Sequence, residues 1–266
     1  MKKIATNEEI AEGSCLLDNE FFNLAAARKE VCQEILTTIL EQPDLIVENV
    51  DVQHLIQGVN REVYLDALCH LPGGRKVNIE VQNQEKNDDV RRCRLHASGV
   101  TMKFTPKRTE FSEIPDVIIV YISRYDALKS EQTVTHVKRC KKVHGEYIPV
   151  DDGEDIYFAN SSINDGTDTA EMLQLMQETK IFNSPKFPAL SNAVNYFKKK
   201  EGGRCEMNQL LKDRIEYENE IVIKKTQDDN IIRMLKKHKD IEEIADDLGL
   251  SVDYVKEVEK EMLVEA

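Results

Sequence analysis

The spacing of apolar residues in the first third of the chain predicts one helix followed by three strands. Over residues 19–41 apolar residues recur at three- and four-residue steps, which is the period of a helix with one buried face. Residues 46–56 alternate between apolar and polar, as a half-buried strand does. Residues 61–70 and 75–83 are rich in strand-forming residues, and the glycine turn between them predicts a β-hairpin.

A helix and a buried strand come next, and their order determines the kind of sheet. Residues 90–104 have helical spacing, and Pro106 follows the expected end of that helix. Residues 116–123 are almost wholly apolar, which is typical of a strand covered on both faces. A helix between the third and fourth strands is a crossover connection, so we expect a mixed sheet in an α/β fold.

The second half of the chain predicts a few more strands and then helices. We expect strands within 133–142 and 145–160, and helices over 169–179, 190–200 and 207–225. Gly202 and Gly203 separate the last two helices and predict a hinge. We expect three parts: an α/β core at 15–160, a helical extension at 161–228 and an acidic tail at 229–266.

The tail has the spacing of a helix-turn-helix. Ile244, Ala245, Leu248 and Val255 are its apolar positions, and Ser251 is a good N-cap for the second helix. That second helix holds more acidic than basic residues, whereas a helix that reads DNA is expected to be basic. We therefore favour a packing or protein-contact role, and a transcriptional regulator acting through the tail remains an alternative.

The composition is that of a globular protein. The chain has 266 residues, a formal net charge of -13 and 41% apolar residues, enough for a hydrophobic core. No apolar run approaches the ~18–20 residues of a spanning helix, and the N-terminus does not read as a secretory signal. Six cysteines are scattered without a CxxC pair, which indicates reduced thiols. We expect a cytoplasmic protein without membrane association; whether it forms a homo-oligomer stays open.

Basic residues gather in the middle of the chain although the total charge is acidic. A negative chain repels nucleic acid, but the local distribution matters more than the sum. A run of charges is also commonly just a solvated face. The basic residues are Arg91, Arg92, Arg94, Lys103, Lys107, Arg108, Lys138, Arg139, Lys141 and Lys142.

The predicted hairpin brings two acidic residues together. Side chains two apart on a strand share a face, so Glu80 and Gln82 point the same way. If residues 72–74 form the turn, Asp66 lies opposite Glu80, and opposed residues have Cβ atoms roughly 4.5–5.5 Å apart. Two carboxylates at that distance repel each other, and a hard divalent cation such as Mg²⁺ reverses the sign.

A metal at this position suits hydrolysis of a phosphodiester. The ion lowers the pKa of a bound water and stabilises charge on the phosphate. Asp66 and Glu80 would hold it, the Val81 carbonyl would complete its shell, and Gln82 would orient water or a phosphate oxygen. The plainer alternative is that the two acids line a solvated strand face, yet Asp66 interrupts a run that is otherwise apolar.

The ordered motifs resemble the PD-(D/E)XK nuclease fold, in particular the recombination-promoting (Rpn-type) nuclease and transposase family. The resemblance covers roughly residues 19–160 and rests on a strand-helix order of αβββαβ. It implies a Mg²⁺- or Mn²⁺-dependent DNA endonuclease with a role in recombination or transposition, whose partner is DNA. The matching residues are Arg61 before Leu65-Asp66, the turn Gly73-Gly74, Ile79-Glu80-Val81-Gln82, the helix residues Arg92, Arg94 and Ser98, and Tyr125-Asp126.

The sequence departs from the family pattern at two places, and at a third the matching residue is open between two candidates. Gln82 stands where the superfamily has lysine, although glutamine is usual in the Rpn-type branch. Leu95 and His96 stand where that branch often has tyrosines. The superfamily also often has an acid on the first helix, for which Glu30 and Glu34 are both candidates.

Three further hypotheses concern the partners of the chain. Arg91, Arg92 and Arg94 are expected to contact DNA phosphates, or else to be solvated. An inactive nuclease fold that only binds DNA or protein is the second reading, since glutamine replaces lysine. A Zn²⁺ site would need a helix over residues 136–144 to align three ligands, but valines there favour a strand. Those three ligands would be His136, Cys140 and His144.

Overall fold

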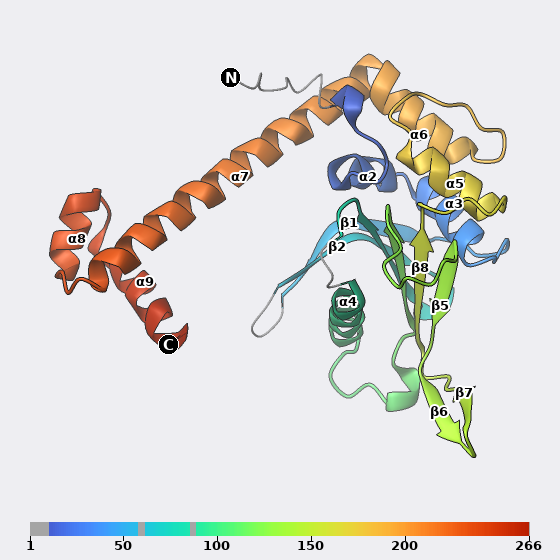
Figure 1. The fold of residues 1–266 in the computed structure, drawn as a ribbon, viewed down its shortest axis with the longest axis horizontal. Helices are drawn as coiled ribbons and strands as arrows, with labels where there is room; N and C mark the ends of the chain where they lie inside the picture. Colours follow the sequence, from blue (N-terminus) through green and yellow to red (C-terminus); the bar gives the residue numbers. More distant parts are fainter. Residues whose placement is uncertain (1–10, 58–61, 86–88, 266) are drawn as a thin grey trace. The chain divides into compact units, whose positions relative to one another are not determined.

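The computed structural model describes residues 11–57, 62–85 and 89–265 (Figure 1). Contacts divide the chain into two compact units, Met1–Asn208 and Gln209–Ala266. Among the described helices none is both long enough and apolar enough to cross a bilayer. The unit that carries the two acidic residues is the first, so its sheet is described before the helices.

A six-stranded mixed sheet forms the centre of the first unit, as the sequence predicted. Its strand order is β1-β2-β3-β4-β8-β5, in which β3, β4 and β8 are parallel to one another and the other pairs are antiparallel. The strands are β1 Asn49–Ile56, β2 Val63–His70, β3 Lys76–Gln82, β4 Val117–Ser123, β5 Val134–Val137 and β8 Glu154–Asn160. Two short strands, β6 Cys140–Val143 and β7 Glu146–Pro149, form a separate ribbon.

Helices cover both faces of the sheet. Figure 1 shows α4 on one side, with α2 and α3 on the other. Every residue of β4 is buried, which confirms the prediction of a strand covered on both faces. The helices of the first unit are α2 Asn19–Ala26, α3 Lys29–Ile39, α4 Asp89–Lys103, α5 Asp168–Gln177 and α6 Pro188–Lys199; α7 Glu201–Leu235 runs into the second unit.

The first predicted helix is two helices in the structure. The backbone of Arg28 is extended and ends the helical run between α2 and α3. Its guanidinium lies 4.1 Å from the centre of the Tyr196 ring on α6. A contact with a residue so far along the chain is invisible to local periodicity, which is why the pattern over residues 19–41 predicted one element.

The predicted hinge at Gly202 and Gly203 is wrong, because α7 runs through both residues. A Cβ added at Gly203 would lie 2.3 Å from the main-chain oxygen of Tyr196. Glycine therefore permits a close approach between the start of α7 and the end of α6, and it does not mark a bend.

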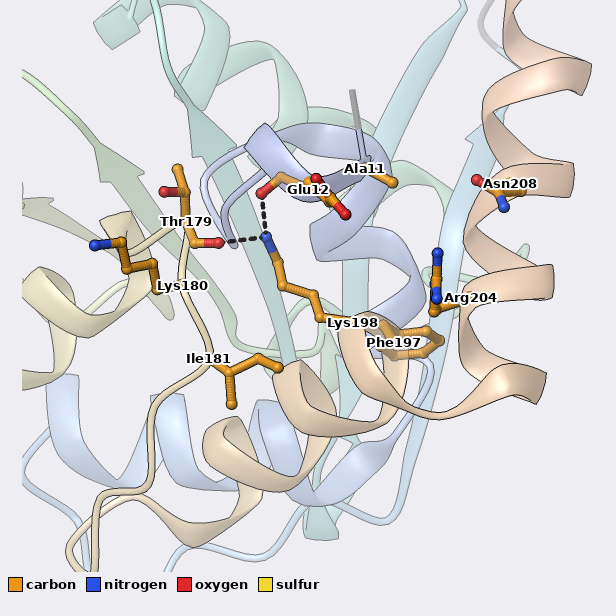
Figure 2. A pocket seen from close by; sticks show the side chains of 9 residues that line it. All are labelled: Ala11, Glu12, Thr179, Lys180, Ile181, Phe197, Lys198, Arg204 and Asn208. Carbon is orange, nitrogen blue, oxygen red and sulfur yellow. Dashed lines mark hydrogen bonds between the residues drawn. The ribbon is translucent and has the colours of Figure 1, made fainter. Parts of the chain in front are cut away.

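A partly buried lysine, Lys198, ties the N-terminal segment to α6 (Figure 2). The Lys198 ammonium donates to the main-chain oxygens of Glu12 at 2.9 Å, Ser14 at 2.6 Å and Thr179 at 2.6 Å. An ammonium has three protons, so all of its donors are used. Lys198 therefore has no free N–H donor to offer to the cavity of about 300 Å³ beside it.

The second unit contains the predicted pair of short helices, α8 Ile241–Leu248 and α9 Val252–Glu265. Gly249 ends α8 in the left-handed conformation with φ 63°, and the Ser251 hydroxyl accepts from the Tyr254 N–H at 3.2 Å. These helices and the end of α7 enclose a small core of their own. Its buried residues are Ile231, Ile244, Ala245, Val255 and Val258.

Candidate functional site

The hairpin of β2 and β3 has the register that the turn predicted. Pro72–Gly74 form one 3₁₀ turn, and the Leu71 N–H donates to the Arg75 oxygen at 3.0 Å. The ladder pairs Leu68 with Asn78 and Ala67 with Ile79. Continued by one residue, this register brings Asp66 opposite Glu80.

At Asp66 the backbone ladder gives way to bonds made by the two carboxylates. The Val81 N–H donates to Asp66 Oδ2 at 3.0 Å. The Asp66 N–H donates to Glu80 Oε1 at 3.3 Å. On the other side of β2, Gln53 of β1 has a positive φ of 49° and is left out of the regular pairing between β1 and β2. The carboxylates therefore replace backbone carbonyl oxygens as the acceptors for these two N–H groups.

Burial and mutual repulsion mark this pair. Glu80 is only 1% exposed, and Asp66 is partly exposed. Burial raises the pKa of the Asp66 carboxyl well above its usual value, and the nearby charge of Glu80 raises it further. The Val81 N–H and Arg92 lower this pKa and offset part of the effect. The site favours the protonated acid, or a cation in place of the proton.

Glu80 has two further neighbours on the face covered by α4. Asn78, two residues earlier on β3, donates from Nδ2 to Glu80 Oε1 at 2.7 Å. The ring of His96 on α4 puts Nδ1 3.0 Å from the same oxygen. His96 is 5% exposed, so the imidazole belongs to the interior of this site.

The three arginines of α4 are separated by helix geometry. Arg92 acts electrostatically on Asp66 and is partly buried. Arg91 and Arg94 are exposed and line a shallow cleft of about 210 Å³, together with Lys138 and Arg139. The basic residues of this cleft therefore come from two segments that are distant in sequence.

Several of these charges already have acidic partners. Arg139 pairs with Asp152 and with Glu154, the latter at 2.7 Å. Lys138 Nζ lies 3.2 Å from Asp155. The positive potential of the cleft consequently depends on Arg91 and Arg94 more than on the β5–β6 segment.

The first turn of α4 is held by two phenols of β4 and the loop after it. Asp89 Oδ1 accepts from the hydroxyl of Tyr121 and, at 2.6 Å, from that of Tyr125. Burial raises the pKa of both tyrosines, and the Asp89 bond raises it further, so they remain donors. Tyr121 is the β4 neighbour of Glu80, so this network anchors α4 directly beside the acids.

The acid contributed by the first helices is neither of those expected from the sequence. Glu34 accepts from the N–H groups of Ala189 at 3.0 Å and Leu190 at 2.9 Å, so it caps α6. Glu30 is exposed. Glu20, in the first turn of α2, is instead the residue whose charge raises the pKa of Asp66.

Gln82 ends β3, beside Ser123 of β4. Its main-chain oxygen accepts from the Arg124 N–H at 3.0 Å, while no described residue hydrogen-bonds to its side-chain amide. By strand alternation the amide shares the face of Glu80. It is therefore available to a ligand at that edge.

Other candidates from the sequence lie away from this site. His136 and Cys140 are on different strands, β5 and β6, and His136 Nε2 lies 2.7 Å from Asp155. The strand expected in this segment is confirmed as two shorter ones. Arg61 lies outside the described residues.

Glu20, Asp89 and His96 were missed as site residues by the sequence analysis. The one available signal was at His96, where the related family often has tyrosine. Nothing in local spacing pointed to Glu20, which reaches Asp66 only because α2 packs on β2 and β3.

Comparison with known proteins identifies one family. The model of the PD-(D/E)XK nuclease family transposase matches residues 22–159. No curated protein and no solved structure gives a significant match.

Proposed function

The chain belongs to the PD-(D/E)XK nuclease transposase family, and from this premise we propose that it is a metal-dependent endonuclease that hydrolyses DNA phosphodiester bonds. Nucleases of the PD-(D/E)XK class generally use divalent metals and act on nucleic acid. The residues we assign to the chemistry are Asp66, Glu80 and Gln82, and the role follows the family: DNA cleavage in recombination or transposition.

The observation that carries this proposal is the pairing of Asp66 with Glu80 in the interior of the hairpin. Each carboxylate accepts an N–H of the other strand, so both are held in place by the hairpin itself. A buried acid beside a second, partly exposed one destabilises a sheet unless the two serve a ligand. A divalent ion is the ligand that such an oxygen pair suits best.

No three His, Cys, Asp or Glu side chains among the described residues already converge on one point. Ion binding therefore requires the carboxylates to turn from their present N–H partners. The raised pKa of Asp66 and the amide of Gln82, to which no described residue hydrogen-bonds, fit a site that gains a cation.

Each residue then has a distinct task. Asp66 and Glu80 would hold Mg²⁺ or Mn²⁺, which supplies an activated water and charge stabilisation at the scissile phosphate. The Val81 carbonyl would complete the oxygen set. Gln82 orients the attacking water or a phosphate oxygen by hydrogen bonds, since an amide cannot act as a base. Arg92, whose charge already acts on Asp66, would contact the phosphate.

DNA would approach along the exposed side of α4. Arg91 and Arg94 are exposed and can contact phosphates outside the reacting centre. Because the chain carries a net charge of -13, we expect this contact to be weak and strongly dependent on salt.

A plasmid-nicking assay with Mg²⁺ or Mn²⁺ tests the proposal. The wild type is expected to convert supercoiled DNA to open-circular or linear forms, and Asp66→Asn and Glu80→Gln are expected to abolish this. Asp51→Asn is the matched control, because Asp51 lies on β1 beside His70 and outside the proposed site. Absence of cleavage with every divalent metal, while DNA is still bound, would instead support the inactive binding module.

A further inference from the structure

His96 has a buried ring nitrogen that makes no aligned hydrogen bond with any described residue. The side chain is 7% exposed, and Nδ1 has no hydrogen-bond partner among the described residues. Glu80 Oε1 is 3.0 Å away, well within hydrogen-bonding distance, but it lies off the direction in which Nδ1 can form a hydrogen bond. Closeness without alignment needs a physical explanation, because a buried nitrogen of this kind normally finds a partner.

Two ligand atoms of one metal ion lie close together in the same way without being aligned for a hydrogen bond to each other. In an octahedral shell with bonds of about 2.1 Å, adjacent ligand atoms lie about 3.0 Å apart, and each lone pair points at the ion and away from its neighbour. In a tetrahedral shell with the same bond length the separation is about 3.4 Å. The contact between His96 and Glu80 matches one edge of an octahedron.

We propose that His96 Nδ1 is a ligand of the divalent ion bound by Asp66 and Glu80, and that this nitrogen makes the site prefer a first-row transition metal over Mg²⁺; Mn²⁺ serves below as the probe of that class. The inference rests on the proposed function and goes beyond it in naming the ion. Imidazole binds first-row transition metals well, whereas Mg²⁺ is bound by oxygen ligands. His96 coordinates with its proton on Nε2.

The other buried unpartnered imidazole nitrogen provides a contrast. His54 Nε2 also has no hydrogen-bond partner, but the atom of His54 nearest to a described carboxylate is Nδ1, 3.7 Å from Asp51. An unpartnered nitrogen alone thus does not make a site. At His96 the free nitrogen and the acid pair occur together.

The neighbours of His96 on α4 are mostly apolar or already hydrogen-bonded, and the charge that acts on the acid pair from this helix is that of Arg92. Cys93 and Ala97 flank His96 on the buried face of the helix, and Arg92 lies toward Asp66. Asp89 is committed to two tyrosines. Because no three such side chains among the described residues already converge, Asp66 and Glu80 would have to turn from their present N–H and amide partners to share an ion with the imidazole.

Electron spin-echo spectroscopy of bound Mn²⁺ tests the ligand directly, without any measurement of cleavage. The full-length wild type loaded with Mn²⁺ is expected to show modulation from a directly bound ¹⁴N. That modulation is expected to change when histidine is labelled with ¹⁵N, and to vanish in His96→Gln. His70→Gln is the matched control and keeps the signal, because His70 pairs with Asp51 elsewhere in the sheet.

Titration calorimetry gives the second measurement. His96→Gln is expected to weaken Mn²⁺ binding by roughly 10–100-fold while Mg²⁺ binding changes little, so the preference for Mn²⁺ falls by the same factor. If His96→Gln does not fold, His96→Tyr keeps an aromatic ring on α4 and removes the nitrogen. The ¹⁵N experiment on the wild type needs no variant.

Two results separate this inference from the proposed function. Mn²⁺ that binds through Asp66 and Glu80 without nitrogen modulation would overturn the role of His96 and leave the nuclease proposal intact. Failure of the wild type to bind any divalent ion, in the presence and absence of DNA, would overturn both.

Discussion

Two regions around the same sheet put a histidine beside a carboxylate, and the two pairs differ in burial and in hydrogen-bond alignment. On β1 and β2, His70 Nε2 and Asp51 Oδ2 form a hydrogen bond of 2.9 Å, with side chains 20% and 36% exposed. Between β3 and α4, His96 and Glu80 approach to 3.0 Å with side chains 7% and 1% exposed, but without hydrogen-bond alignment.

Stability alone would favour a complete hydrogen bond in the buried pair, and the structure has it in the partly exposed pair instead. Water can satisfy the exposed pair, so alignment there matters little, whereas a buried pair destabilises the fold unless its hydrogen bonds are complete. The buried pair is the one left incomplete. A region that sacrifices stability in this way is typical of a functional site.

The largest expected effect is on cleavage. Glu80→Gln keeps the shape of the side chain but removes a charge from the proposed metal site, and a metal contributes several kcal/mol to phosphate hydrolysis. At 1.36 kcal/mol for each factor of ten, we expect a loss of roughly 10³-fold or more. Asp51→Asn should stay within about twofold in the same single-turnover assay. Equal losses in both variants would erase the distinction between the regions.

The next effect is on thermal stability with metal. An ion at 100 times its Kd stabilises the folded state by about 2.7 kcal/mol, which raises the Tm by roughly 5–10 °C for a unit of this size. Differential scanning fluorimetry with Mn²⁺ should detect this rise in the wild type and in Asp51→Asn. In Glu80→Gln the rise should be absent; a rise that persists there would mean the ion binds elsewhere.

A smaller effect concerns Asp66 without metal. Burial and Glu80 raise its pKa in the folded state, so the folded protein binds a proton more readily than the unfolded chain does. Stability should therefore fall as pH rises from the ordinary aspartate pKa through the raised one. Asp66→Asn retains the acceptor for the Val81 N–H and should remove this slope, which raises the Tm near neutral pH by roughly 2–4 °C for each kcal/mol of repulsion relieved.

Urea unfolding at several pH values in the presence of EDTA measures that slope. Asp126→Asn is the opposite control. Although burial acts to raise its pKa, backbone N–H groups of Glu131 and its neighbours hold the pKa of Asp126 below the usual value. Asp126→Asn should lose stability at neutral pH. If Asp66→Asn and Asp126→Asn both stabilised the protein, the gain at Asp66 would reflect the loss of any negative charge and not the relief of its repulsion with Glu80.

The smallest effect is at the exposed pair. His70→Gln removes a partly solvated contact, for which about 0–1 kcal/mol is typical. The urea midpoint should move little, and cleavage should not change. A large loss of stability would show that the exposed pair is as critical as the buried one.

The sequence predicted the parts of the site that depend on short-range geometry. A turn of known length sets the register of a hairpin, so the proximity of Asp66 and Glu80 followed from counting residues. The crossover helix between β3 and β4 likewise predicted the mixed sheet. Both are confirmed in the structure.

Features that depend on how elements pack were not predicted. The contact of His96 with Glu80 depends on the angle at which α4 crosses the sheet, which no spacing in the sequence specifies. The separation of Arg92 from Arg91 and Arg94 could have been anticipated, because adjacent helical residues point about 100° apart. The sequence analysis treated the three as one patch.

The cap that Glu34 provides for α6 has a consequence for biosynthesis. Its acceptor groups meet partners 155 and 156 positions later in the chain. At 5–20 residues per second a ribosome needs roughly 8–30 s to make that stretch. Through that interval α3 presents a charged, half-covered surface while the acids of the hairpin have already emerged. A chain that ended near residue 160 would lack the N–H partners of Glu34, so this side of α3 would stay uncovered.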